Sequence, residues 1–297
     1  MAGAPISPGS RPTRPRSLHP TPHGQGGVMG AIRVLVVGAS SGVGRAIAQR
    51  FVRAGAEVAF SARRAENLDD AIAEAGGGHA VPGDVRAPGG AEQVVRATVD
   101  ALGGIDLILY ATGVSPLQRL RHASREQWTQ VLETNLIGLH EVVQAALPHL
   151  APGSAVGVLS SDSVGMPRPG LVPYAASKAA LEELIRGWRN EHPELRFTTI
   201  VIGPTYPTEF GTSFDPDLMG ELWVEWERLG IADASIMDGN ELADVIVSTY
   251  LALLPYDGIG MEQIVLRPSK SPGSEFNREE LFAETQVRAT SEEGGAT

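Results

Sequence analysis

Gly38-Ala39-Ser40-Ser41-Gly42-Val43-Gly44 directly follows the aliphatic run Ile32–Val37 and precedes a helical pattern over Arg45–Arg53. Glycines let the backbone turn sharply and approach a pyrophosphate, whose charge the N-terminus of the following helix stabilises. Such a turn between a strand and a helix can also serve tight packing alone. Because it lies at the first strand of a strand–helix pattern, it predicts a dinucleotide site. The predicted contacts are Gly38, Ser40, Ser41, Gly42, Val43 and Gly44.

Short apolar runs alternate with helical patterns along the rest of the chain. The runs are continuous rather than alternating, which is typical of strands buried on both faces. Strands separated by helices predict right-handed crossovers and one α/β domain, with a doubly wound, seven-stranded parallel sheet of the Rossmann type. The predicted strands are Ile32–Val37, Glu57–Ser61, His79–Pro82, Ile105–Ala111, Ala155–Ser160, Arg196–Ile202 and Glu262–Leu266, and the longest predicted helices are Arg125–Ala146 and Pro173–Glu191.

Composition excludes several classes of function. The chain has 297 residues, of which 35 are acidic and 24 basic, so its net charge of −11 argues against nucleic-acid binding. It contains no cysteine, which removes disulfides, thiolate nucleophiles and cysteine-based zinc sites. No metal site is predicted. The apolar runs are far shorter than the ~20 residues of a membrane span, and we expect a cytoplasmic protein.

Both ends of the chain differ from the predicted domain over residues 29–268. Residues 1–28 are rich in proline and poor in large apolar side chains, which predicts a disordered N-terminal extension. This interpretation includes a start assigned too early, with Met29 as the first residue. An interaction arm is the alternative. Residues 269–297 form a polar C-terminal tail, in which Phe276, Leu281 and Phe282 allow one short amphipathic helix.

The residues after the second and third predicted strands indicate which dinucleotide binds. An acid about 20 residues beyond the glycines would hold the ribose 2′-hydroxyl of NAD. Arg63 and Arg64 stand there instead, and two guanidiniums suit a 2′-phosphate, which favours NADP(H). Solvated loop arginines are the alternative. Asp84 can accept a hydrogen bond from the adenine amino group while Val85 covers the ring, although an aspartate after glycine is often a turn residue.

A serine, a tyrosine and a lysine follow the fifth predicted strand. Tyr174 and Lys178 are spaced i, i+4 and share one helix face, while Ser161 ends the strand. A free phenol has a pKa near ~10, and a nearby ammonium lowers it, which favours proton transfer to a carbonyl oxygen. A lone pair of this kind is common on helix surfaces. Together with the glycine-rich loop and Ser161, it predicts a catalytic group.

In this order and spacing the motifs resemble the short-chain dehydrogenase/reductase family, in its compact single-domain branch, over about residues 31–268. The resemblance implies that Tyr174 is the general acid/base, that Lys178 lowers its pKa and holds the nicotinamide ribose, and that Ser161 orients the carbonyl. It further implies that Asn135 helps to hold a water for proton relay to the lysine.

The resemblance also implies cofactor contacts outside the glycine-rich loop and a homodimer or homotetramer. Thr208 matches a threonine that contacts the carboxamide of the nicotinamide. The other implied contacts are Ala111, Thr112, Gly113 and Pro204.

Three departures from the family pattern concern binding geometry more than chemistry. Val37 stands where the family has threonine, and Tyr110-Ala111-Thr112-Gly113 stands where it has Asn-Asn-Ala-Gly. The second loses an asparagine that supports the central strands. Gly203-Pro204 reverses the usual Pro-Gly.

We therefore expect an NADP(H)-dependent oxidoreductase that moves a hydride between the cofactor and a ketone, aldehyde or secondary alcohol. A catalytically silent NADP-binding regulatory protein is the main alternative, and a sugar-nucleotide epimerase or dehydratase is a further one. In the resembled family residues 205–240 cover the substrate. Here that interval holds Phe210, Phe214, Trp223 and Trp226, which indicates a hydrophobic or ring-bearing substrate or, alternatively, the packing of a helix pair.

Overall fold

The computed structural model describes residues 31–232 and 235–269. The extension predicted for residues 1–28 and the tail beyond residue 269, with its predicted short helix, lie outside the described residues. Among the residues that are described, no helix is both long and apolar enough to cross a membrane.

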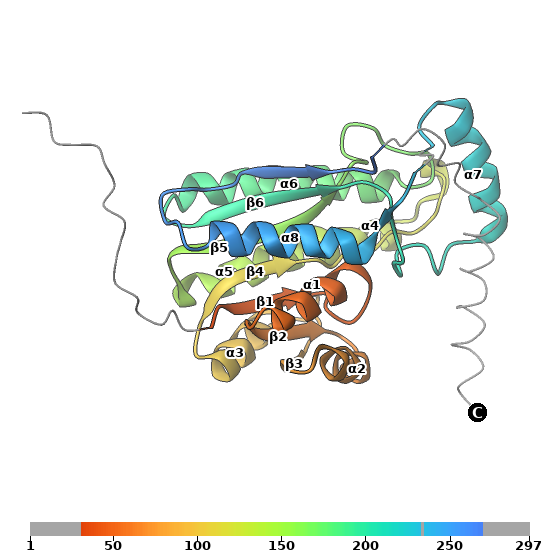
Figure 1. Cartoon of the computed structure of the whole chain (residues 1–297). Coiled ribbons are helices and arrows are strands. Elements are labelled where there is room, and N and C mark those ends of the chain that lie inside the picture. Colours follow the sequence, from red (N-terminus) through yellow and green to blue (C-terminus); the bar gives the residue numbers. More distant parts are fainter. Residues whose placement is uncertain (1–30, 233–234, 270–297) are drawn as a thin grey trace, which may run out of the picture. The chain divides into compact units, whose positions relative to one another are not determined.

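The described domain is built on one seven-stranded sheet, as predicted (Figure 1). Its order is β3-β2-β1-β4-β5-β6-β9, and every neighbouring pair is parallel. All carboxyl ends therefore lie along one edge, where ligands bind in such sheets. The strands are β1 (Arg33–Val37), β2 (Glu57–Ala62), β3 (His79–Pro82), β4 (Ile105–Tyr110), β5 (Leu150–Ser161), β6 (Arg196–Ile202) and β9 (Gln263–Leu266).

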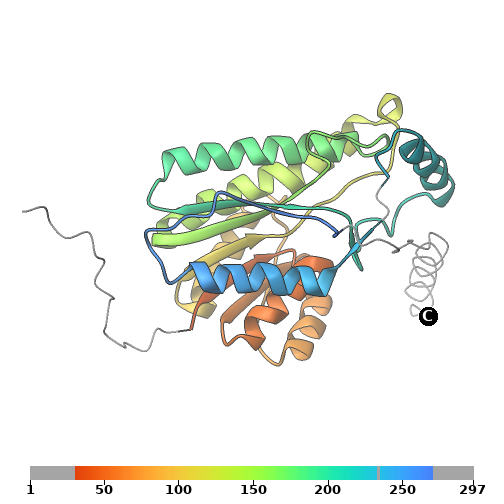
Figure 2. The ribbon, with the colours of Figure 1, turned by 45° about the horizontal axis from the view of Figure 1, so that its top comes forward.

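Helices cover both faces of the sheet (Figures 1 and 2). Each buries an apolar stripe: α1 places Phe51 in the core of one face, and α6 places Ile185 in the core of the other. Fully burying such a side chain contributes about 1.5–3 kcal/mol. The first face carries α1 (Gly42–Arg53), α2 (Ala65–Ala75) and α8 (Gly239–Leu253), and the second carries α3 (Gly90–Leu102), α5 (Gly138–Ala146) and α6 (Val172–Glu191).

The helix predicted over Arg125–Ala146 is interrupted. It consists of α4 (Arg125–Leu132), a π-helical turn η2 (Glu133–Ile137) and α5. A π turn adds one residue without ending the helix, so the apolar spacing of the sequence did not reveal it. Asn135, one of the predicted site residues, lies within this turn.

The burial predicted for both faces of every strand is wrong for the two edge strands, β3 and β9. In β3 only Val81 is buried, and in β9 the side chain of Val265 is 48% exposed. A continuous apolar run therefore did not distinguish an edge strand from a central one.

A helix whose bounds were not predicted, α7 (Pro216–Arg228), lies beyond the carboxyl edge of the sheet (Figure 1). It begins at Asp215, whose carboxylate accepts hydrogen bonds from the amides of the first turn. We call residues 205–232, which include α7, the covering segment. Its start is held by β7 (Thr205–Tyr206), which pairs in parallel with β8 (Met237–Asp238).

Candidate active site

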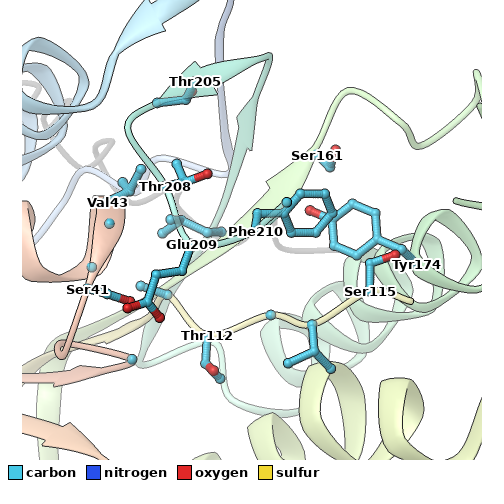
Figure 3. Close-up of a pocket in the computed structure, with 18 of the residues that line it drawn as sticks. Ser41, Val43, Thr112, Ser115, Ser161, Tyr174, Thr205, Thr208, Glu209 and Phe210 are labelled. Carbon is cyan, nitrogen blue, oxygen red and sulfur yellow. The ribbon is translucent and has the colours of Figure 1, made fainter. Parts of the chain in front are cut away.

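A cleft of about 650 Å³ lies at the carboxyl edge of the sheet, between the glycine-rich loop and the covering segment (Figure 3). It is lined by all the predicted catalytic and cofactor residues except Asn135, including Ser161, Tyr174 and Lys178. In the described part of the chain, no three His, Asp or Glu side chains are grouped to suit a metal ion.

Glycine is required twice in the loop between β1 and α1. Gly38 has φ of +92°, and a Cβ there would lie 2.8 Å from the amide nitrogen of Thr112. A Cβ on Gly44 would overlap the carbonyl oxygen of Gly38. Helix α1 begins at Gly42, earlier than predicted, and its N-cap Ser41 makes no side-chain capping bond. The first amides of α1 are therefore available to a phosphate.

The two predicted phosphate ligands at the end of β2 are both exposed. Arg63 lies close enough to Asp84 to lower the pKa of its carboxyl, although the hydrogen bond from Arg86 contributes most to that shift. Arg64 donates to the carboxylate of Glu209 in the covering segment, at 3.0 and 3.3 Å. No sequence pattern indicated this contact, because 145 residues separate the two.

The next two positions after β3 differ in their surroundings. Asp84 forms an ion pair of 2.6 Å with Arg86 and also accepts from its backbone amide. Val85 lines the cleft but is 7% exposed and packs in the core, where a Cβ on Gly138 would press against it. The carboxylate predicted to bind adenine is thus already paired, and the valine presents little surface to a ring.

The predicted catalytic side chains converge at the floor of the cleft. Ser161 ends β5, and its hydroxyl accepts a hydrogen bond from the amide of Ser163 at 3.1 Å. Lys178 is 3% exposed, and its ammonium donates to the carbonyl of Leu159 at 2.8 Å. The same nitrogen lies 5.8 Å from the ring centre of Tyr174. A proton donor, a second hydroxyl and a buried cation therefore surround one space.

The direction predicted for the pKa of Tyr174 is wrong in this structure. Burial raises the pKa of this phenol to about 12, more than its interaction with the Ser161 hydroxyl lowers it. Burial also lowers the pKa of Lys178 to about 8, which the nearby carboxylate of Glu182 opposes. The spacing of Tyr174 and Lys178 predicted their proximity but not the desolvation that acts on both.

Asn135 holds the backbone of Val114 and the hydroxyl of Ser177, one residue before Lys178. Its side-chain oxygen accepts from the amide of Val114 at 2.8 Å, and its amide nitrogen donates to the carbonyl of Val114 and the hydroxyl of Ser177. Its side chain is fully buried. The part in a water relay that the resemblance implies remains a prediction.

Tyr110 stands where the family pattern has an asparagine that supports the central strands, and it forms a supporting contact of its own. The buried Tyr110 hydroxyl donates to the carbonyl of Thr134 at 2.6 Å and so connects the end of β4 to the π turn. The departure at Tyr110–Gly113 therefore keeps a link between the central strand and the helix beside it.

A buried ion pair that the sequence did not predict follows Ser161 directly. Arg168 donates to both carboxylate oxygens of Asp162, at 3.2 and 3.1 Å, and the two side chains are 8% and 10% exposed. The guanidinium also donates to the hydroxyl of Ser163 and to the carbonyl of Ile231. Arg168 thus connects the end of β5 to the covering segment. No periodicity or motif links it to Asp162.

The covering segment closes the cleft with apolar side chains. The ring of Phe210 lies 4.8 Å from that of Tyr174, and Phe214 meets Phe210 edge to face at 5.6 Å. Trp226 is 5% exposed and donates to the carbonyl of Pro169 at 2.9 Å. The predicted alternatives both apply in part, because Phe210, Phe214 and Trp223 line the cleft while Trp226 also packs the helix.

Comparisons with known proteins identify the family. The family model "short chain dehydrogenase" matches residues 33–218, more than half of the chain. The chain belongs to the short-chain dehydrogenase family. The resemblance that the sequence motifs indicated is thereby confirmed.

Among curated short-chain dehydrogenase relatives, glycine betaine reductase ATRR of Emericella nidulans is 30% identical over 269 residues. The match covers 88% of this chain but only 20% of that protein. This chain likewise spans 58% and 63% of the lengths of the next two curated relatives.

Solved structures share the fold. A dehydrogenase/reductase from Sinorhizobium meliloti 1021 matches with a TM-score of 0.67 and 26% identity, over 79% of this chain and 92% of that one. A short chain dehydrogenase from Burkholderia cenocepacia J2315, in complex with NADP, matches with a TM-score of 0.68 and 22% identity, over 80% and 96%.

Removing Arg168 should destabilise the protein strongly. Arg168→Met leaves the carboxylate of Asp162 buried without its main partner, and we expect a loss of about 3–5 kcal/mol in the free energy of unfolding, measured with urea. The double variant Asp162→Asn with Arg168→Met should recover part of the loss. Arg119→Met, which breaks a more exposed pair with Glu225, should cost less than about 1 kcal/mol. Equal losses for the two single variants would contradict this account.

Proposed function

We propose that this chain is an NADP(H)-dependent dehydrogenase/reductase that transfers a hydride between the cofactor and a ketone, aldehyde or secondary alcohol. The observation that carries the proposal is the convergence of Ser161, Tyr174 and Lys178 in one cleft with the glycine-rich loop. The family membership supports the same reaction class.

The residues along the cleft fit such a cofactor. The first amides of α1 and the bare backbone at Gly38 and Gly44 suit the pyrophosphate. Arg63 and Arg64 suit a 2′-phosphate, since each guanidinium offers paired donors. The Burkholderia relative was solved with NADP, which agrees with this preference. Thr208 lies opposite Gly42, on the nicotinamide side that the family resemblance implies.

The side chains at the floor of the cleft would transfer a proton to or from the oxygen of the substrate. When bound, the nicotinamide ring supplies or accepts the hydride. In the reducing direction the phenol of Tyr174 donates its proton to the carbonyl oxygen of the substrate, and the hydroxyl of Ser161 donates a hydrogen bond to the same oxygen. The ammonium of Lys178, held by the carbonyl of Leu159, stabilises the phenolate that forms. Its remaining N–H groups would be available to a ribose hydroxyl of the cofactor.

The lining of the cleft supports a hydrophobic or ring-bearing substrate. Phe210, Phe214 and Trp223 offer aromatic faces, which bind rings by offset or edge-to-face packing. The homodimer or homotetramer implied by the family resemblance stays a prediction.

Tyr174→Phe should remove turnover while leaving cofactor binding intact. Loss of the proton donor is expected to lower kcat by about 10²–10⁴-fold, since general acid catalysis contributes that much. The measurement is NADPH oxidation with a panel of hydrophobic ketones and aldehydes, together with calorimetric titration of NADPH. Undiminished turnover would contradict the mechanism, and NADPH binding by the wild type without any turnover would favour the silent binding protein.

Arg63→Asp should weaken NADPH far more than NADH. Losing a charge-assisted contact to the 2′-phosphate is expected to raise the Kd of NADPH about 10–100-fold, whereas that of NADH should change little. Arg96→Asp, at an exposed position on α3, makes the same change of charge away from the cleft and serves as control. Equal weakening of the two cofactors would show that Arg63 does not read the phosphate.

Reduction should slow as pH rises through about 8. The pKa of Lys178 is about 8, so its ammonium loses its proton there, while Tyr174, with a pKa of about 12, stays protonated. We expect kcat for reduction to fall above that pH. Lys178→Arg keeps its charge and should move the fall beyond about pH 10, at whatever lower rate it retains. A flat profile in the wild type, or the same fall in Lys178→Arg, would contradict the assignment.

A further inference from the structure

Two neighbouring residues of the covering segment contact opposite ends of the cleft. The carboxylate of Glu209 accepts from the guanidinium of Arg64 at 3.0 and 3.3 Å. The next residue, Phe210, lies against Tyr174 with 4.8 Å between ring centres. In Figure 3 the side chain of Glu209 extends from the covering segment toward Ser41 of the glycine-rich loop, so it crosses the part of the cleft that suits a dinucleotide.

A phosphate group can replace Glu209 as the partner of Arg64. The two side chains are 47% and 51% exposed, and ion pairs that solvent reaches contribute little to stability. A phosphate monoester carries about −1.5 to −2 charges near neutral pH and three acceptor oxygens, so it binds a guanidinium better than one carboxylate does. A carboxylate that stayed beside the bound phosphate would also repel it.

Phe210 connects the replacement of Glu209 at Arg64 to the phenol of Tyr174. Its ring occupies space beside Tyr174, where a substrate must bring its carbonyl oxygen. Because Glu209 and Phe210 are adjacent in the chain, displacement of the carboxylate from Arg64 also frees the backbone that carries the ring. The contacts at the two ends of the cleft are therefore coupled.

We propose that Glu209 is a specificity-determining residue: its carboxylate holds Arg64 in place of a 2′-phosphate, and a cofactor that carries this phosphate displaces it and so releases Phe210 from Tyr174. The inference rests on the proposed use of NADP(H). Discrimination between NADP(H) and NAD(H) then depends on competition between Glu209 and the 2′-phosphate for Arg64, as well as on the attraction of the phosphate to the arginines. Binding of the 2′-phosphate also opens the substrate side of the cleft.

The first test compares Glu209→Gln with the wild type by calorimetric titration. Without the competing charge, NADPH should bind about two- to five-fold more tightly, as expected for the loss of one exposed ion pair, and the gain for NADH should be smaller. Glu191→Gln, at the far end of α6, removes the same charge from an exposed position and should change neither Kd. Unchanged or weaker NADPH binding by Glu209→Gln would overturn the proposal.

The second test follows the release of Phe210 by amide hydrogen exchange over residues 205–214. Adenosine 2′,5′-bisphosphate carries the 2′-phosphate without a nicotinamide, so it should speed exchange in the wild type, whereas AMP should not. Glu209→Gln should exchange faster before any ligand is added. Equal effects of the two nucleotides, or wild-type exchange rates in the variant, would contradict the coupling.

The two proposals fail in different ways. If the wild type binds neither NADPH nor adenosine 2′,5′-bisphosphate, the proposed cofactor is wrong and Glu209 has no phosphate to compete with. If the wild type selects NADPH but Glu209→Gln changes neither affinity nor exchange, the cofactor assignment stands and the role of Glu209 is refuted.

Discussion

The close packing of Gly38 and Gly44 is the constraint on which the candidate site depends. Any side chain at these positions would meet backbone, at Thr112 in one case and at Gly38 itself in the other. Glycine there lets α1 begin directly beside the ends of β1 and β4, and it leaves bare amides facing the cleft. The parallel register then aligns the end of β5, with Ser161, at the same edge.

Burial of charge is the second theme of the site. Lys178 is almost inaccessible to solvent and has a lowered pKa, yet its ammonium is compensated by a carbonyl from β5. Asp162 and Arg168 compensate each other near Tyr174. Interactions between charges are stronger where water is excluded, so these few groups set the electrostatics around Tyr174. The carboxylate of Asp162 raises the pKa of Tyr174, and the guanidinium of Arg168 lowers it.

The parts of this structure that local pattern encodes could be predicted, and the parts that depend on distant partners could not. Continuous apolar runs predicted the sheet, and the i, i+4 spacing predicted that Tyr174 and Lys178 lie together. The π turn that contains Asn135 was not predicted, because one added residue leaves the helical periodicity almost unchanged. The partners of Arg64 and Arg168 could not be predicted for another reason. The packing of the covering segment and of the loop after β5 brings Glu209 and Asp162 to these arginines, and residue spacing does not reveal that packing.

The proposed function requires that the cleft binds a dinucleotide and recognises its 2′-phosphate. Side-by-side calorimetric titration of NADPH and NADH into the purified wild-type chain measures this. We expect NADPH to bind at least about tenfold more tightly than NADH, as one charge-assisted contact to the phosphate would give. Equal affinities would contradict the role of the arginines after β2, and binding of neither would contradict the assignment of the glycine-rich cleft as a cofactor site.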